Sequence, residues 1–561
     1  MDMRKRKKKT VGLTYALGTG ALVFAVWGSP SSALAFDETY EAEDAYFQDA
    51  ETAAEHNGYT GSGFVDYTPN EPGGYIEWQI NAPSSGTYRL HFRYAHGGSD
   101  GDRPAEVEVN GSLIDRNLAF VPTDGWGDWG YTGLNANLEE GSNTIRLTGV
   151  GEEGGANIDH LWIENDSSGD DGDDDDNSGG SGDAYYVAVD GSDSSSGSES
   201  NPFATIDHAV DTVDAGDTIY LRGGTYQLGE TIDLEADGTS SEGYHLLAYD
   251  GESPILDFSE MEDDDGNRGI EVHGDYWHLK GFTVQGAGDN GMFVDGSNNL
   301  IEELDVRENQ DSGIQLHTGA SDNTVRNVDS YYNYDPGDHG ENADGFAAKF
   351  DTGSGNVFEG CRAWNNSDDG YDFWKANAAI TVKDTWVFRN GVNTWGDSDF
   401  QGDGNGIKLG RGDGNHTIER ALIWENPGNG VNHNKHAEAV NVYHVTAYAN
   451  ATLDSGKNNF QFSDSEAEHV LRNNVSHDGP VSSMDDVDDE YNSWNLSVDV
   501  SDSDFISLND NEADGPRSAD GSLPETDFLK LDSGSDLIDA GTDIGLSYEG
   551  SAPDLGAYEK E

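Results

Sequence analysis

Four aspartates lie close together where the sequence repeats a short phrase, a polar residue followed by glycine and a large apolar residue. They are Asp344, Asp368, Asp369 and Asp372. Asp344 and Asp369 both come directly before the glycine of their phrase, so they stack in one column if each phrase is one coil of a solenoid. Strands of neighbouring coils lie about 4.8 Å apart, and two carboxylates at that spacing can share one Ca²⁺, whose bonds to oxygen are about 2.3–2.6 Å long. A set of oxygen ligands alone favours Ca²⁺ over Zn²⁺.

Lys408 has the same repeat position as Asp372, two residues after the glycine of its phrase. The spacing therefore predicts that Lys408 lies one coil beyond Asp372, beside the predicted ion. A neutral lysine can act as a general base. Ca²⁺ and Arg411 would lower its pKa while the acids would raise it, and we expect an alkaline optimum for activity. A plain lysine–aspartate salt bridge explains the same pattern and can coexist with catalysis.

Two markers recur in step and predict the fold that carries these residues. Glycines recur at intervals of 22, 32, 25, 36 and 24 residues, and asparagines at intervals of 24, 32, 25, 36 and 24. The glycines are Gly291, Gly313, Gly345, Gly370, Gly406 and Gly430, and the asparagines are Asn309, Asn333, Asn365, Asn390, Asn426 and Asn450. A coil of roughly 22–25 residues with asparagine at a turn is typical of a parallel β-helix. The two long intervals place insertions at 334–343 and 394–405, next to the predicted site.

The rest of the chain divides by composition into four segments. Residues 1–35 have a basic start, an apolar run and an A-x-A site, which predicts a secretory signal. Residues 36–165 show short alternating strands, which predict a β-sandwich. Residues 166–183 are an acidic linker without apolar residues, and residues 184–561 form the predicted β-helix, with a short helix from Ile206 capping its open end. The predicted fold class is therefore all-β, a right-handed parallel β-helix preceded by a β-sandwich.

The charge balance restricts the possible partners. The chain has 561 residues, with 108 acidic and 30 basic side chains and a formal net charge of −78. Such a charge repels nucleic acid and suits cation binding. It is also typical of a halophilic protein, which is adapted to high salt. The single cysteine, Cys361, rules out a disulfide within the chain and is expected in the core. We expect a secreted, extracellular monomer without a membrane contact after cleavage of the signal.

The β-sandwich region resembles a known group of sugar-binding modules. The phrases YEAE, GYTGSGFVDY, RPAEVEVNG, TDGWGDW, GSNTIRLTG and GGANIDHLWI are similar, in order, to carbohydrate-binding modules of family 35 and the related family 6. The resemblance implies a structural Ca²⁺ held by Glu41, Glu43 and Asp159. It also implies a sugar site with Trp126 and Asn157, with Arg103 as a further candidate. Trp129 is as good a candidate as Trp126 for the exposed indole.

The repeat region resembles family 9 of the polysaccharide lyases, which are parallel β-helix pectate lyases. The similar phrases are NADGFAAKF, GCRAWNNSDDGYDFW, VFRNG, NGIKLG, DAGTDIGL and APDLGAYE. The resemblance implies that the four aspartates bind a catalytic Ca²⁺ and that Lys408 is the base. It implies β-elimination on polygalacturonate, which leaves 4,5-unsaturated oligogalacturonides, and it makes pectin and other uronic-acid oligosaccharides the expected partners.

Three alternatives stay open at this point. The first is a lyase for another uronate polymer or for rhamnogalacturonan. The second is a glycoside hydrolase on the same scaffold, which would need two carboxylates flanking the bond and no essential lysine or metal. The third is a non-catalytic adhesin that binds polysaccharide. A fold alone does not decide among them, and the aspartate–lysine pattern favours the pectate lyase.

Overall fold

The computed structural model describes residues 37–165 and 183–560 apart from short gaps. The gaps are residues 55, 69–71, 84–85, 98–102, 121–122, 124, 128, 139–140, 152–153, 241, 453–455, 465–466, 486, 519–520 and 547. The predicted signal at 1–35 and the predicted linker, except its last residue, lie outside the described residues. Two compact units, 1–175 and 176–561, divide the chain, and each is described by itself. None of the helices within the described ranges is long and apolar enough to cross a membrane.

The first unit is a β-sandwich of two mainly antiparallel sheets. The first sheet has the order β3-β4-β11-β6-β9, with β1 also paired to β11, and the second has the order β2-β5-β10-β7-β8. The first sheet contains β1 (Asp37–Glu41), β3 (Ala50–Ala53), β4 (Phe64–Tyr67), β6 (Gly86–Ala95), β9 (Gly130–Leu138) and β11 (Asn157–Asn165). The second contains β2 (Tyr46–Gln48), β5 (Tyr75–Ala82), β7 (Ala105–Val109), β8 (Ser112–Leu118) and β10 (Gly141–Gly149). Alternate residues such as Trp78 and Phe92 form the core between the sheets.

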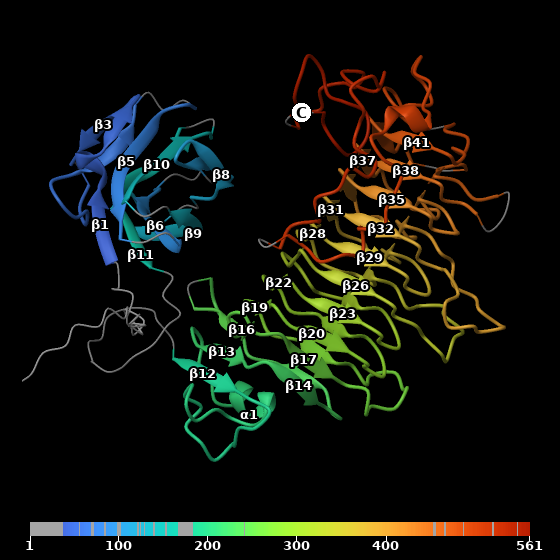
Figure 1. Ribbon diagram of the computed structural model, residues 1–561, viewed down its shortest axis with the longest axis horizontal. Helices are drawn as coiled ribbons and strands as arrows, with labels where there is room; N and C mark the ends of the chain where they lie inside the picture. The colour runs from blue at the N-terminus through green and yellow to red at the C-terminus, as the bar shows by residue number, and fades with distance from the viewer. Residues whose placement is uncertain are drawn as a thin grey trace, which may run out of the picture. The chain divides into compact units, whose positions relative to one another are not determined.

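The second unit is a parallel β-helix whose coils each add one strand to three sheets of eleven, ten and nine strands (Figure 1). The eleven-stranded sheet contains β12 (Ala184–Val187), β13 (Thr218–Leu221), β16 (Tyr244–Ala248), β19 (Trp277–Lys280), β22 (Leu300–Glu302), β25 (Thr324–Arg326), β28 (Asn356–Glu359), β31 (Ile380–Lys383), β34 (Thr417–Glu419), β37 (Asn441–Tyr443) and β40 (Val470–Arg472). The ten-stranded sheet contains β14 (Gly224–Gln227), β17 (Pro254–Asp257), β20 (Thr283–Gln285), β23 (Asp305–Arg307), β26 (Asp329–Tyr331), β29 (Arg362–Trp364), β32 (Trp386–Phe388), β35 (Leu422–Trp424), β38 (Thr446–Tyr448) and β41 (Val475–His477). The nine-stranded sheet contains β15 (Ile232–Leu234), β18 (Ile270–Val272), β21 (Met292–Val294), β24 (Ile314–Leu316), β27 (Phe346–Ala348), β30 (Tyr371–Asp372), β33 (Ile407–Lys408), β36 (Val431–Asn432) and β39 (Phe460–Gln461).

The helices of the chain are short. They are η1 (Ala42–Asp44), α1 (Ile206–Val210) and η2 (Asp502–Asp504). In α1, Ile206 and Ala209 are buried in the same core as the first coils, and the Thr205 hydroxyl accepts from the His208 amide as its N-cap. The predicted helix therefore exists at the start of the solenoid, although it ends before Val213.

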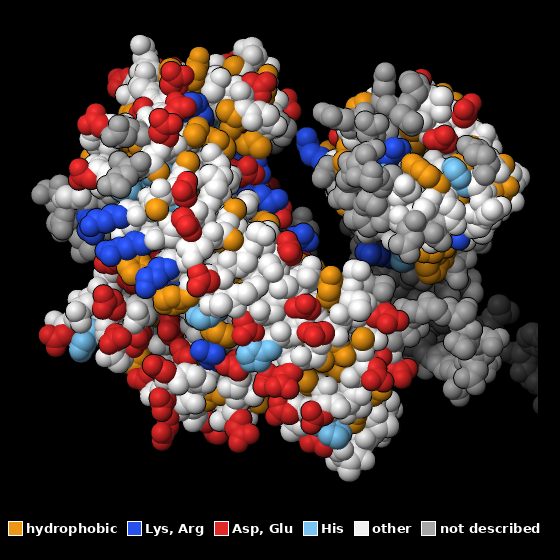
Figure 2. All heavy atoms as spheres, turned by 180° about the vertical axis from the view of Figure 1, so that it is seen from behind, with side chains coloured by type: hydrophobic (Ala, Val, Ile, Leu, Met, Phe, Trp, Pro, Cys, Tyr) orange, Lys and Arg blue, Asp and Glu red, His pale blue; other side chains and the backbone are white. Residues whose placement is uncertain are grey.

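The interior of the solenoid is filled by one apolar side chain after another along the stacked strands. The core runs from Val187 to Leu471, and Cys361 lies in it as a buried thiol. Asp and Glu side chains, by contrast, are spread over the face shown in Figure 2 rather than gathered in one patch. Among the described residues most Asp and Glu side chains are exposed or half-buried, which sets apart the few that are buried.

A ladder of buried asparagines fixes the step between coils. The side-chain amide of each accepts from the backbone of the coil before it, as when Asn390 Oδ1 accepts from the Asn366 amide at 3.2 Å. The ladder consists of Asn309, Asn333, Asn366, Asn390, Asn426 and Asn450. Asn459, which follows Asn450 within the same coil, ends it by accepting from the Asn450 amide at 3.2 Å. The prediction was wrong at one coil, because Asn366 and not Asn365 is the ladder residue. Asn365 has φ +53 and precedes the ladder position, so two adjacent asparagines made the register ambiguous.

The C-terminal segment covers the outer face of the ten-stranded sheet. Rings from successive coils stack there, with Trp364 lying 4.2 Å from Tyr331 and Phe388 lying 4.3 Å from Trp424. Phe528 and other apolar residues of the segment pack against this face. One face of the solenoid is therefore closed by the chain itself.

Two buried histidines stand at turn positions that asparagine occupies elsewhere. His416 and His469 directly precede strands of the eleven-stranded sheet, as Asn299 and Asn323 do, and each accepts a backbone N–H at Nδ1. Burial lowers the pKa of His416 to about 3 and that of His469 to about 4. Both rings are therefore neutral in the folded chain.

This arrangement predicts an acid-sensitive contribution to stability. The His416 pKa is 6.5 without the fold, so the stability from the neutral ring is fully present above that pH and is lost as the pH falls toward 3. The free energy of unfolding of the wild type should fall between pH 7 and pH 4. In His416→Asn, which keeps an acceptor at this turn, this fall should be smaller than in the wild type by about 2–3 kcal/mol. Urea titrations of both proteins across this range measure the difference, and parallel curves would contradict it.

Candidate active site

The predicted column of polar residues before each glycine exists and is joined by hydrogen bonds. The Asp369 amide donates to Asp344 Oδ1 at 3.1 Å, and the Asn405 amide donates to Asp369 Oδ1 at 2.7 Å. Asn405 Oδ1 in turn accepts from the Asn429 side chain at 2.8 Å. On the preceding coil the Ser312 hydroxyl donates to Asp344 Oδ2 at 3.2 Å. The repeat of the sequence thus becomes a continuous row beside the nine-stranded sheet.

Three carboxylates of the site converge. One oxygen from each of Asp344, Asp368 and Asp369 lies within 4.8 Å of the others, and all three side chains are buried. Burial and the nearby charges of Asp372 and Asp369 raise the pKa of Asp344 to about 7. Burial, together with neighbouring acids, raises the pKa of Asp369 to about 6 and lifts that of Asp368 well above its usual value. Carboxylates held this way are costly when charged, so a bound cation would relieve them.

Lys408 lies where the spacing predicts it. It is paired in register with Asp372, on β33 and β30. Its Nζ lies 2.9 Å from Asp369 Oδ2, 3.4 Å from Asp372 Oδ2 and 3.3 Å from Asp403 Oδ2. Burial lowers the pKa of Lys408, and the surrounding carboxylates, led by Asp369, outweigh it, so that the pKa lies above its ordinary value.

A second lysine, which the sequence reasoning missed, enters the same cluster. Nζ of Lys349 lies 2.8 Å from Asp344 Oδ2 and 3.7 Å from Asp372 Oδ2, and the residue is 8% exposed. Its signal in the sequence was a single cation in the apolar phrase FAAKF. Lys349 follows the end of β27, where the chain leaves the strand, so the repeat did not predict the direction of its side chain.

The cluster opens into a pocket of about 480 Å³. Arg411 lines it with its guanidinium 4.9 Å from the centre of the Trp374 ring. Asp403, from the second insertion, and Glu341 and Asn342, from the first, form part of the rim. The insertions at 334–343 and 394–405 therefore border the site, as predicted.

The residues present fit a Ca²⁺ ion. All the candidate ligand atoms are carboxylate oxygens, the donors that Ca²⁺ prefers. Asp372 Oδ1 is buried without a hydrogen-bond partner, and Asp369 Oδ2 has only the ion-pair contact with Lys408. When ionised, the four aspartates and two lysines have a formal charge of −2, and Asp403, 3.3 Å from Lys408, adds another negative charge, so a divalent cation would offset most of the excess.

The β-sandwich unit has a second acidic group where the resemblance implies a structural ion. Glu41 and Asp159 lie with His160 in a cluster whose ligand atoms are within 4.8 Å of one another. Asp159 also accepts from Arg93 Nη1 at 2.5 Å. Glu43 accepts at Oε1 from the Gly63 amide at 3.1 Å, while its Oε2 is buried and without a partner. These carboxylates also fit a cation, although Arg93 already neutralises part of the charge.

The predicted sugar site of the module is less open than expected. Trp126 is half-buried, with the Arg103 guanidinium 5.1 Å from its ring centre and the His56 ring stacked at 6.0 Å. Arg103 is only 7% exposed and donates from Nη1 to the Gly155 carbonyl at 3.1 Å. Asn157 is also buried. The structure brings Trp126 and Arg103 together, but it does not present Arg103 as a free arm, because a backbone carbonyl and the indole hold it.

Comparison with known families agrees with both units. The profile described as "Pel9A-like, right handed beta helix region" matches residues 185–474, and the profile "Carbohydrate binding module (family 6)" matches residues 41–165. The first match covers about half of the chain. It confirms the all-β fold class and the predicted right-handed parallel β-helix.

Individual relatives point the same way. The chain is 40% identical over 387 residues to "Pectate lyase L" of Dickeya dadantii (strain 3937), covering 67% of this chain and 90% of that one. It is 36% identical to "Pectate lyase PEL9" of Emericella nidulans over 64% of this chain and 94% of that one. The crystal structure of pectate lyase Pel9A aligns with a TM-score of 0.64 and 38% identity over 68% of this chain and 97% of that one. The chain therefore belongs to the Pel9A-like right-handed β-helix family, family 9 of the polysaccharide lyases, and carries a family 6-type carbohydrate-binding module ahead of its β-helix.

Proposed function

We propose that this enzyme is a secreted, Ca²⁺-dependent pectate lyase that cleaves polygalacturonate by β-elimination. The observation that carries the proposal is the position of Lys408, whose Nζ faces Asp369 and Asp372 in a pocket where buried carboxylates converge. The names of the relatives, which include pectate lyases from a bacterium and a fungus, support the choice of substrate. A glycoside hydrolase would not need a buried lysine among carboxylates that can bind a metal ion.

The proposed reaction uses the residues of the pocket in separate roles. Asp344, Asp368, Asp369 and Asp372 would hold the ion. Ca²⁺, when bound there, would supply positive charge against the uronate carboxylate and against the negative charge that develops on it. Neutral Lys408 takes the proton from C5 at Nζ, the electron pair forms the C4–C5 double bond, and the C4–O bond breaks. The leaving oxygen receives a proton from solvent, and no water is added to the sugar.

Arg411 and Trp374 form the substrate-facing wall in this proposal. A guanidinium pairs well with a carboxylate, and Arg411 is exposed with its plane supported by Trp374. The pair would bind a uronate next to the one that reacts. The proposal also includes export through the sequence at 1–35 and retention on uronic-acid polysaccharide by the binding module.

Calcium removal tests the ion directly. In a chelator the wild-type enzyme should form no ultraviolet-absorbing product from polygalacturonate, and added Ca²⁺ should restore it. Asp369→Asn keeps an acceptor for the Asn405 amide but removes a charge, so it should weaken Ca²⁺ binding at least tenfold by calorimetry. Full activity in chelator, or an unchanged calcium affinity in Asp369→Asn, would contradict the proposed ion site.

A further inference from the structure

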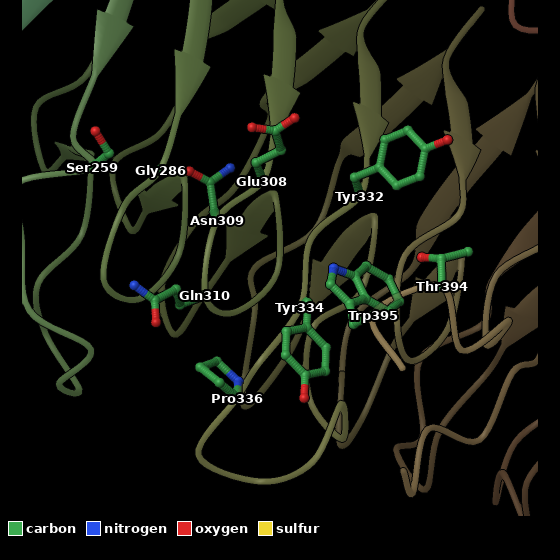
Figure 3. Close-up of a pocket in the computed structure, with 10 residues that line it drawn as sticks. All are labelled: Ser259, Gly286, Glu308, Asn309, Gln310, Tyr332, Tyr334, Pro336, Thr394 and Trp395. Atoms are coloured by element: carbon green, nitrogen blue, oxygen red, sulfur yellow. The ribbon is translucent and has the colours of Figure 1, made fainter. Parts of the chain in front are cut away.

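A second pocket lies at the turn that follows β20, β23 and β26 of the ten-stranded sheet. It is separate from the candidate active site, which lies beside the nine-stranded sheet. It has a volume of about 630 Å³, within the range of small-ligand sites. Figure 3 shows Tyr334 and Trp395 next to one another, with Gln310 on one side and Tyr332 on the other. The pocket shares none of its lining residues with the active-site pocket.

The aromatic part of this pocket is built by the two insertions. Tyr334 and Trp395 stack with ring centres 4.8 Å apart and planes 13° apart. The Tyr334 hydroxyl donates to Asp397 Oδ2 at 2.8 Å, and the same oxygen contacts His339 Nδ1 at 3.0 Å. These contacts join the two insertions to each other.

Polar groups that suit a sugar surround these rings. Tyr332, two residues before Tyr334, is 37% exposed and also lines the pocket. The side chains of Gln310, Tyr332 and Thr394 make no hydrogen bond to another described residue, so their donors and acceptors are available to a ligand. A pyranose needs this combination, an apolar ring face together with hydrogen-bonding side groups.

The charge of the pocket decides which sugar it fits. Its ten described lining residues include Glu308 and no Lys, Arg or His. The active-site pocket, in contrast, contains Lys349, Lys408 and Arg411. A uronate chain would meet an uncompensated carboxylate here, whereas an uncharged sugar would not. We propose that this pocket binds neutral glycosyl residues, which goes beyond the lyase reaction and does not depend on it.

Calorimetry on the full chain tests the proposal with named probes. A neutral β-1,4-galactan tetrasaccharide and a neutral α-1,5-arabinan tetrasaccharide are titrated, with tri-galacturonate as the charged comparison. All proteins carry Trp126→Ala, so that the sugar site predicted in the binding module is weakened in each of them. At least one neutral probe should bind, and Tyr332→Ala and Trp395→Ala should each weaken it about tenfold. Tyr548→Ala, which removes another exposed tyrosine, should leave its affinity unchanged.

A charge-reversal variant and a check on folding complete the test. Glu308→Lys should create additional binding of tri-galacturonate, because it reverses the one charged side chain among the described lining residues. If Trp395→Ala lowers the melting temperature, Tyr332→Ala still decides, since its ring is at the surface. The proposal is overturned if neither neutral probe binds, if Tyr332→Ala does not weaken the binding, or if Tyr332→Ala weakens tri-galacturonate instead.

Discussion

Replacing Lys408 by alanine should abolish nearly all elimination, with kcat lower by about 10²–10⁴-fold, the usual contribution of a general base. The side chain is the proposed proton acceptor, and its Nζ is held by three carboxylates. Ultraviolet absorbance with polygalacturonate and saturating Ca²⁺ measures the loss. Because these carboxylates raise the pKa of Lys408, the activity of the wild type should increase toward alkaline pH.

Two lysine controls separate the role of a base from that of a charge. Lys349→Ala removes the other buried ammonium group of the cluster but leaves Lys408, so it should retain elimination and change mainly the affinity for Ca²⁺. Lys383→Ala removes a surface ion pair with Glu359 and should have no effect. If Lys349→Ala were inactive and Lys408→Ala active, the proton acceptor would be Lys349.

Replacing Arg362 by alanine should lower the free energy of unfolding by about 3–5 kcal/mol. Arg362 is 1% exposed and bonds to Asp329 from Nε at 2.7 Å and again from Nη2. Its Nη1 donates to the carbonyls of Ala513 and Gly515 at 2.7 and 2.9 Å. The variant would leave two carbonyls and part of a buried carboxylate without partners, which is more costly than the loss of contact area.

The matched control is Arg326→Ala, which removes an arginine that is 45% exposed and lies 3.7 Å from Glu302. Such surface pairs contribute about 0–1 kcal/mol. Urea titration compares the two, and limited proteolysis reports whether the C-terminal segment leaves the ten-stranded sheet. Equal stability of the two variants, with no new cleavage, would show that Arg362 does not hold this segment.

The solenoid was predictable because two kinds of residue, glycine and asparagine, recur in the sequence with nearly the same period. Glycines and asparagines kept step, and the insertions fell where the intervals lengthened. The one error, Asn365 in place of Asn366, arose where two asparagines were adjacent and only backbone geometry distinguishes them. The outer cover of the ten-stranded sheet was not predictable, because it joins distant parts of the chain, as when Phe528 packs against Trp424 and Arg362 bonds to Ala513.

The candidate site was predictable as far as the columns reach. Asp344 and Asp369 share a column, and Lys408 pairs with Asp372, because strand register carries such positions from coil to coil. Lys349 and Asp403 lie in turns, where no register applies, and were missed. Arg103 was a further candidate for the sugar site, but the packing that turns it toward Gly155 and Trp126 is not visible in the sequence.

The asparagine ladder has a consequence for how the length of this chain can vary. Because each rung ties one coil to the next, residues added at a turn are absorbed as loop, and the strands after them resume in step. Residues 334–343 and 394–405 are two such additions. Asp403 and Asn405 contact Lys408 and Asp369, but the parts of the insertions away from these two residues could be lengthened while Asp369 and Lys408 kept their places. A single residue gained within Gly406–Lys408 has no such outlet, since it would turn the lysine to the opposite face of the strand. Variation in the length of the turns should therefore change how the enzyme binds its substrate more readily than it changes the residues that carry out the reaction.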